Sequence, residues 1–335
     1  MIWATWRQFR TQAIVAGAAL VAAVVALTIN GLNLSHLYAA SGASSCPSTG
    51  ACAALENFLA DAQTGSTSAL FIIGTALLYL VPPLIGVFWG APLVARELET
   101  GTHRLAWNQS VTRDRWLTVK LAVLGAASMA FAGLLSLTVW LSSSRMDQAT
   151  QDRVTPELFG ARGIVPIGYA AFAFVLGVAF GILIRRTVPA MASTLAVYAG
   201  AVGAMTLWGR AHLLPARQLT QALNFDNLRS FNIRNNQEIH ITIDPKLSGA
   251  WVLKNDTVTQ SGHVFDGPVN QQACSRDVSP KSCIDWVQTL NLKQNLVYHT
   301  PGQFWGLQWA ETGVFLALAG LLAGFGFWWL RRRSA

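Results

Sequence analysis

The chain has 335 residues, of which 52% are hydrophobic and only 12% are charged, and its formal net charge is +8. Soluble globular proteins carry about 25% charged residues, so this composition excludes a disordered tail protein, an ordinary cytosolic enzyme and a nucleic-acid-binding protein that relies on a basic surface. The mean hydropathy of +0.38 indicates a polytopic membrane protein, in which positive charges mainly determine topology.

Residues 1–12 are predicted to form a short amphipathic helix in the membrane interface. Ile2, Trp6 and Phe9 follow helical spacing on one face, whereas two arginines lie on the other. Such a pattern is typical of interfacial helices. The alternative is a basic N-terminus that only sets topology. A cleaved signal peptide is disfavoured, because the following apolar run is longer than the ~7–15 residues of a signal sequence.

Six segments are apolar over enough residues to cross a bilayer, which takes about 20. They are Ile14–Ile29, Ala69–Val94, Leu121–Leu141, Ile164–Ile184, Val188–Leu207 and Ala310–Leu330. Residues 13–207 thus hold transmembrane helices one to five, and residues 304–335 hold helix six and a basic cytoplasmic tail. In the second segment, Pro82 and Pro83 predict a kink or a broken helix.

The distribution of charge places both termini in the cytoplasm. The predicted inner segments are rich in arginine, whereas the predicted outer loop 30–68 has no Lys or Arg. Tryptophans support these boundaries, because aromatic rings prefer headgroup depth. Trp89, Trp116, Trp328 and Trp329 fall at predicted inner ends, and Trp140, Trp208, Trp305 and Trp309 fall at predicted outer ends.

All four cysteines fall in the two longest predicted outer loops. Four cysteines allow three connectivities, of which the local pairs Cys46–Cys52 and Cys274–Cys283 are the simplest. Disulfide bonds form in an oxidising compartment, so cysteines in the outer loops agree with an orientation in which both termini are cytoplasmic. A Cys/His metal site is disfavoured because no paired C-x-x-C occurs, and no metal ligand is predicted.

Residues 208–303 are predicted to form a small mixed α/β extracellular cap between helices five and six. Isoleucines at every second position predict a half-buried strand over Glu238–Ile243, and Gly249–Leu253 is a second candidate strand. Asn255–Cys283 is rich in turn residues. The predicted fold class is therefore an all-α membrane protein with six transmembrane helices, an N-terminal interfacial helix and this cap.

The predicted spans hold almost no ionisable residue, and only Glu311 lies within one, near its outer end. Ion-coupled carriers place such residues at membrane depth, so a proton- or sodium-driven carrier is disfavoured. No selectivity filter or internal inverted repeat is visible. The motifs G-x-x-x-x-G-K-[ST], H-E-x-x-H and G-x-S-x-G are also missing. We therefore predict no enzyme, no catalytic residue and no cofactor on this chain; if it pumps, a partner supplies the energy.

The most informative segment is the cytoplasmic loop 95–116, which is dense in charge and also carries apolar side chains. Its first part reads Arg96, Glu97, Leu98, Glu99, Thr100, Gly101, Thr102, His103 and Arg104. A short helix of this kind can dock into a groove of a soluble subunit, and Ser110 or Thr112 is expected to cap the third span. The alternative is a solvated loop that only anchors topology.

The sequence resembles the permease subunits of ABC-2-type exporters, especially those of actinobacteria. The resemblance lies in Arg96-Glu97-x-Glu99-x-Gly101-Thr102, in Arg113-x-Arg115-Trp116 with Lys120, and in the turn Arg185-Arg186-Thr187-Val188-Pro189. It implies that Glu97–Arg104, preceded by Arg96, form the coupling helix to a separate ATP-binding subunit. The segment 208–303 departs from it, since many such permeases have a smaller region there.

The resemblance also implies partners and a role. Two ATP-binding subunits, which hold the ATP and Mg²⁺, would drive two permease chains, either identical or similar, in a bacterial plasma membrane. The cargo would be a hydrophobic or amphipathic compound such as a drug, antibiotic, peptide or lipid, moved outward; membrane lipid is expected as a partner and nucleic acid is not. The alternative is a membrane sensor or immunity protein whose extracellular domain binds a ligand without transport. A membrane enzyme lacks a paired acid/base constellation.

Overall fold

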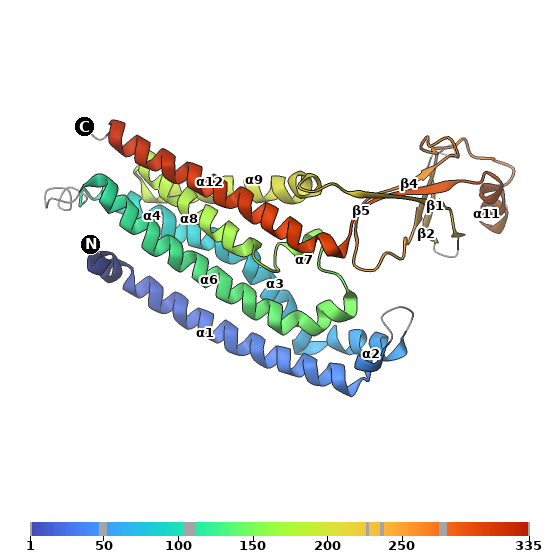
Figure 1. The fold of residues 1–335 in the computed structure, drawn as a ribbon, viewed down its shortest axis with the longest axis horizontal. Helices are drawn as coiled ribbons and strands as arrows, with labels where there is room; N and C mark the ends of the chain where they lie inside the picture. The colour runs from blue at the N-terminus through green and yellow to red at the C-terminus, as the bar shows by residue number, and fades with distance from the viewer. Residues whose placement is uncertain are drawn as a thin grey trace. The chain divides into compact units, whose positions relative to one another are not determined.

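The computed structural model describes residues 2–46, 52–102, 112–225, 228–234, 238–274 and 280–333. The chain divides into two compact units. The first comprises Met1–Leu213 and Trp305–Ala335, and the second comprises Leu214–Phe304. The first unit is a helical bundle, and the second holds the strands (Figure 1).

Within the residues that the structure describes, six helices of the bundle are long and apolar enough to cross a membrane, which confirms a mainly helical, multi-pass membrane protein. They are α1 (Ile2–Ala40), α3 (Gly65–Ile85) continued by the π turn η2 (Gly86–Gly90) and α4 (Ala91–Glu99), α6 (Arg113–Thr150), α8 (Val165–Ile184), α9 (Thr187–Ala204) continued by η3 (Met205–Gly209) and α10 (Arg210–His212), and α12 (Phe304–Arg333). We call the end of the bundle where α1 begins and α12 ends the terminal end, and the opposite end the distal end (Figure 1).

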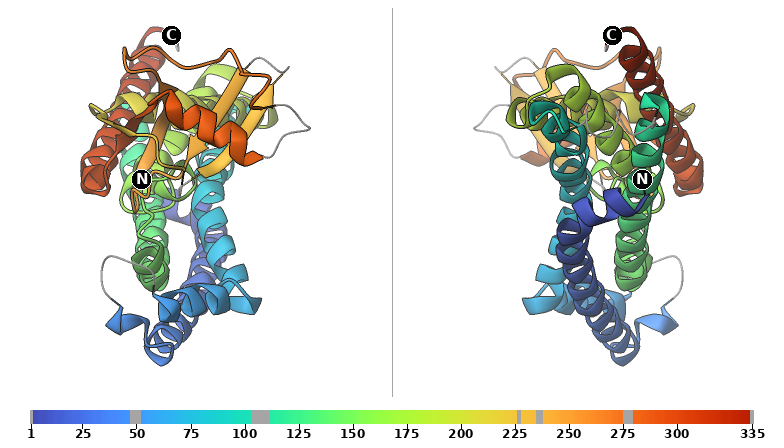
Figure 2. Two further views of the ribbon diagram at one scale, coloured as in Figure 1. Left: turned by 90° about the vertical axis from the view of Figure 1, so that its right-hand side faces the viewer. Right: turned by 90° about the vertical axis from the view of Figure 1, so that its left-hand side faces the viewer.

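Several of these helices extend beyond the apolar segments. Residues 2–12 are helical as predicted, but they continue into the first span as one helix, whose first turns run at an angle to the rest (Figure 2). The predicted outer loop 30–68 contains the end of α1, the short helix η1 (Ala43–Ser45) and α2 (Ala53–Ala62). Hydropathy detects only the part of a helix inside the hydrocarbon core, whereas backbone hydrogen bonding continues into the headgroup region.

The second span is not broken at its prolines. Pro82 and Pro83 lie inside α3, and the π turn η2 begins at Gly86, just past them. A proline has no N–H to donate, which disturbs the i→i−4 hydrogen bonds around it, and a π turn is one way in which a helix accommodates such a disturbance. The helix therefore changes its winding here and continues to Glu99.

Helix α8 is the most deeply buried of the six spans. Glycines allow its backbone to lie directly against η2 and α4. A Cβ atom added at Gly86 would lie 2.6 Å from the Ala173 carbonyl oxygen, and one added at Gly181 would lie 2.8 Å from the Ala91 oxygen. Small residues are what permits such close helix contacts in a membrane, where apolar burial gives no driving force.

The described part of the second unit contains two antiparallel sheets. The strands are β1 (Arg217–Ala222), β2 (Leu228–Arg234), β3 (Glu238–Ile243), β4 (Trp251–Val258) and β5 (Lys293–His299), in the orders β1-β5-β4 and β2-β3. The predicted strand Glu238–Ile243 coincides with β3, and the other predicted strand overlaps the start of β4. Ile241 and Ile243 are buried against Val287 of helix α11 (Pro280–Thr289).

Both local disulfide bonds are present. Cys46 pairs with Cys52 just before α2, and Cys274 pairs with Cys283 in α11, with Cα atoms 6.0 Å and 4.6 Å apart. In the bundle, Phe58 of α2 is buried with Leu34 of α1. The first bond therefore closes the connection between two helices that pack together.

The glycine contacts predict a specific packing defect. Gly177→Ala is expected to destabilise the bundle by about 1–3 kcal/mol, because the added carbon would lie 2.7 Å from the Ala91 nitrogen. The matched control is Gly200→Ala in α9, where nothing lies within 4 Å of an added Cβ atom. Thermal unfolding of both variants in detergent measures the difference, and equal melting temperatures would contradict this account of the α8 contact.

Candidate functional site

The last turn of α4 is fixed to α6 by an ion pair between a buried lysine of α6 and a partly exposed glutamate of α4. Lys120 of α6 is only 4% exposed, and its Nζ lies 2.6 Å from Oε1 of Glu97. The same ammonium group donates a hydrogen bond to the Leu93 carbonyl oxygen at 3.1 Å and lies 4.4 Å from the ring centroid of Trp116. A buried charge is costly unless it is paired, so these contacts hold the end of α4 in one position.

Glu99 joins the same turn of α4 to α9. Its carboxylate accepts hydrogen bonds from the Thr187 backbone N–H at 3.0 Å and from the Thr187 hydroxyl at 2.7 Å. The N-cap residue of α9, Arg186, makes no side-chain capping bond. Glu99 therefore caps the N-terminus of α9 from another helix, where the helix dipole also favours a negative charge.

The predicted coupling residues lie partly in this turn. Arg96, Glu97, Leu98 and Glu99 form the end of α4, which is continuous with the second span and is not a separate short helix. Thr100 and Thr102 follow in a turn, and Gly101 between them has a φ of 73°. Arg104, His103 and Ser110 lie outside the described residues, and the coupling role of all these residues stays a prediction.

Further contacts complete the terminal end. The Thr112 side chain accepts a hydrogen bond from the Arg115 N–H, so it caps α6 as expected. Arg331 of α12 donates to both carboxylate oxygens of Asp114: its Nε lies 3.2 Å from Oδ1, and its Nε and Nη2 lie 3.1 Å and 2.8 Å from Oδ2. The start of α6 is therefore linked to α12, while its Lys120 is linked to α4.

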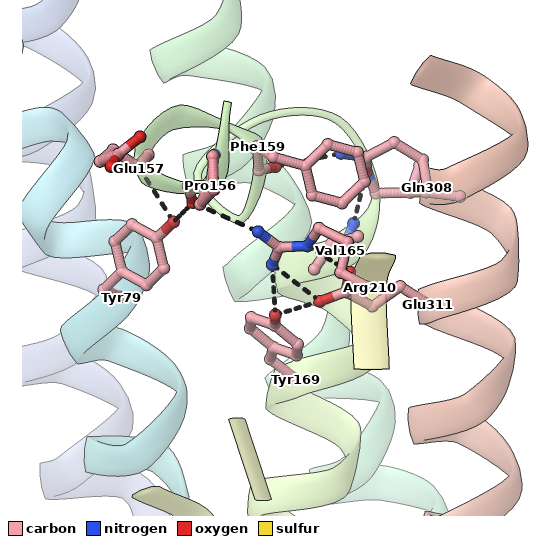
Figure 3. Close-up of polar contacts among 10 residues, drawn as sticks. Tyr79, Pro156, Glu157, Phe159, Val165, Tyr169, Arg210, Gln308 and Glu311 are labelled. Atoms are coloured by element: carbon pink, nitrogen blue, oxygen red, sulfur yellow. Dashed lines mark hydrogen bonds and ion pairs between the residues drawn. The ribbon is translucent and has the colours of Figure 1, made fainter. Parts of the chain in front are cut away.

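A second polar cluster, centred on the buried side chains of Arg210 and Glu311, lies at the distal end (Figure 3). Arg210 and Glu311 are both 0% exposed, and two hydrogen bonds of 2.8 Å and 3.0 Å join the guanidinium group to the carboxylate. The Tyr169 hydroxyl donates to the same carboxylate. Arg210 also donates to the Pro156 carbonyl oxygen at 3.2 Å, which in turn accepts a hydrogen bond from the Tyr79 hydroxyl.

This cluster connects most of the helices at the distal end. Its members come from α3, α8, α10, α12 and the short helix α7 (Pro156–Phe159). Gln308 of α12 adds a link to α8, because its side-chain oxygen accepts hydrogen bonds from the Ile164 and Val165 N–H groups. In the same region Arg162 and Asp147 form a buried pair with 3.0 Å between Nε and Oδ2.

The polar atoms of the Arg210 cluster form hydrogen bonds with one another, so the cluster is a structural contact that holds several helices together. Both oxygens of Glu311 accept hydrogen bonds from within it. Within the described part of the chain, no group of three or more His, Cys, Asp or Glu residues is placed to hold a metal ion.

Sequence reasoning found Glu311 but missed its partner. The predicted fifth span ends at Leu207, which places Arg210 in the predicted outer domain, whereas the helix continues to His212. Asp147 and Arg162 likewise fall between the predicted third and fourth spans, although Asp147 lies in α6. Glu311 itself was the signal that could have revealed its partner, because a carboxylate at membrane depth requires a cation. Arg210 is a nearby candidate, since it follows the predicted fifth span closely.

The cluster predicts a double-mutant effect on stability. Glu311→Leu or Arg210→Met alone is expected to cost about 3–5 kcal/mol, because each leaves one buried charge unpaired, and the double variant is expected to recover most of this loss. Arg331→Gln is the control, since that ion pair is 68% and 43% exposed, and it should leave thermal unfolding unchanged. Additive losses in the double variant would contradict the account.

A model of the family described as ABC-2 membrane transporter related matches residues 17–210, which is more than half of the chain. The match runs from α1 to the start of α10 and includes the end of α4. Comparisons with curated proteins and with solved structures gave no match. The chain therefore belongs to the ABC-2 membrane transporter related family of ABC-type permease subunits.

Proposed function

We propose that this permease subunit moves a hydrophobic or amphipathic compound outward and is driven by a separate ATP-binding subunit that contacts the end of α4. The observation that carries the proposal is the anchoring of this one turn to two other spans, through Glu97–Lys120 and Glu99–Thr187. The chain has no phosphate-binding loop of its own. ATP and Mg²⁺ therefore belong to the partner, and this chain performs no hydrolysis.

The proposed coupling is mechanical. A force applied at Arg96–Thr102 acts on a turn that is tied to α6 by the Lys120 pair and to α9 by the Glu99 cap. The glycine contacts of η2 and α4 tie the same segment to α8. Packed elements shift as discrete units and do not deform gradually, so the closing of two ATPases would move several spans together.

The proposed orientation places the terminal end in the cytoplasm. This end carries a high density of arginine, including Arg96, Arg185 and Arg331. The Cys46–Cys52 bond follows the other end of α1, and a disulfide bond fits an oxidising exterior. A second permease chain, identical or similar, and two copies of the ATPase complete the proposed assembly.

One observation favours the alternative of a ligand-binding membrane sensor. The second unit has its own apolar core and a hollow of about 310 Å³ lined in part by Leu223, Phe225 and Val287. A sensor of this kind would bind its ligand through residues 214–304, and ATP turnover would not depend on the chain. The variant described next separates the two functions, because it lies in the bundle.

Glu99→Gln weakens the hydrogen bonds to Thr187 and removes the charge at the N-terminus of α9. We expect permease-dependent ATP turnover in proteoliposomes to fall about tenfold, a typical size for coupling between two sites, with normal membrane insertion. Thr187→Val, which keeps the backbone N–H, should give a smaller loss.

Glu56→Gln is the matched control, because Glu56 is an exposed acidic residue of α2. It should leave ATP turnover unchanged. Unaltered turnover and transport in both Glu97→Gln and Glu99→Gln would contradict the coupling role and favour the sensor.

A further inference from the structure

An apolar groove of about 510 Å³ opens on the side of the bundle between α1, α3 with η2, and α6. Helix α1 contributes Ala16 and Ala19, the opposite wall contributes Val81 and Phe88, and α6 contributes Phe131. None of the described residues that line it is charged. Phe88 is 51% exposed, so the groove is accessible from the side of the bundle that faces lipid. Its volume lies within the roughly 300–1,000 Å³ of small-molecule sites.

The floor of the groove is a fixed structure. Trp89 makes edge-to-face contacts with Phe9 and Phe131, with ring centroids 4.9 Å and 5.7 Å apart. Trp89 belongs to the π turn η2, whose glycines pack against the backbone of α8. Because that contact leaves no room for η2 to move away, the wall that η2 supplies is in place before any ligand binds.

One end of the groove is polar and positively charged. A second hollow shares Gln12, Phe88 and Trp89 with the groove and extends to Arg96. The structure shows no ion pair to Arg96 from any residue that it describes. The acidic neighbours of Arg96 on α4 are engaged elsewhere, Glu97 with Lys120 and Glu99 with Thr187.

An apolar groove that ends at a guanidinium group is complementary to an amphiphile with an anionic head. Arginine binds phosphate groups in a bidentate geometry, and anionic lipids are attracted to basic residues at the membrane surface. A neutral apolar compound would make no use of Arg96. A second copy of the chain would bring the same excess of arginine to this end, so charge disfavours it as the occupant.

We propose that this groove binds one acyl chain of an anionic phospholipid, with the lipid phosphate at Arg96 and Gln12. The lipid comes from the leaflet around the terminal end. Only the naming of that leaflet as cytoplasmic rests on the proposed function, so lipid binding to the isolated chain tests the site independently of transport.

The test is native mass spectrometry of the full chain in detergent, with phosphatidylglycerol or phosphatidylcholine of identical acyl chains as probes. The wild type is expected to retain one phosphatidylglycerol per chain, with a preference of about tenfold over phosphatidylcholine, and Arg96→Gln should abolish this preference. Arg332→Gln removes an exposed charge at the same end, away from the groove, and should retain the preference.

Two variants fill the groove itself. Ala16→Trp and Ala19→Trp are expected to lose both lipids, whereas Val197→Trp on α9, at a position that is 44% exposed, should retain them. Monodisperse elution on size exclusion shows that each variant is folded, and using two positions guards against one that is not. Equal retention of both lipids by the wild type, or full retention by both groove variants, overturns the proposal. A loss of dimer in place of lipid in the same spectra identifies a second chain as the occupant and also overturns it.

Discussion

The rest of the bundle depends on the close approach of α8 to η2 and α4. In a membrane, apolar side chains gain little from burial against one another, so tight contact between backbones must supply the packing energy. The glycines at 86, 90, 177 and 181 provide that contact. Pro82 and Pro83 precede the π turn, which directs Trp89 to one side and the glycines to the other. The second span is thus both a wall of the groove and the element that rests on the central helix.

The polar contacts lie at the two ends of this packed centre and serve different purposes. At the distal end, Arg210 and Glu311 form a closed and fully buried cluster that joins spans. At the terminal end, Glu97 and Glu99 are partly or fully accessible, yet each is bonded to another span. The first arrangement suits a fixed junction, and the second suits a surface on which a partner can act.

Much of the fold could be predicted from the sequence, because apolar runs long enough to cross a bilayer are a strong signal. All six spans, strand β3 and the two local disulfide bonds were predicted. The ends of the helices were not, because polar residues such as those at 142–150 continue a helix once it leaves the hydrocarbon core. Strands β1, β2 and β5 carry few apolar residues in regular alternation and were missed.

The polar sites could be predicted only in part, because they depend on pairs that are far apart in sequence. Glu97 and Glu99 were recognised as a motif, but nothing local indicates that Lys120 and Thr187 are their partners. Arg210 and Glu311 form an ion pair in the first unit, but the whole of the second unit lies between them in the sequence. The predicted fifth span ends five residues before His212, where the helix ends, and this difference was enough to separate the two charges.

The measurement that tests the central claim most directly is the identification of what the chain binds in its native membrane. The tagged chain would be solubilised in mild detergent and its companions identified by mass spectrometry. The account predicts a soluble protein with a phosphate-binding loop, in a fixed ratio to the permease. Recovery of the chain alone, under conditions that keep other membrane complexes intact, would contradict it.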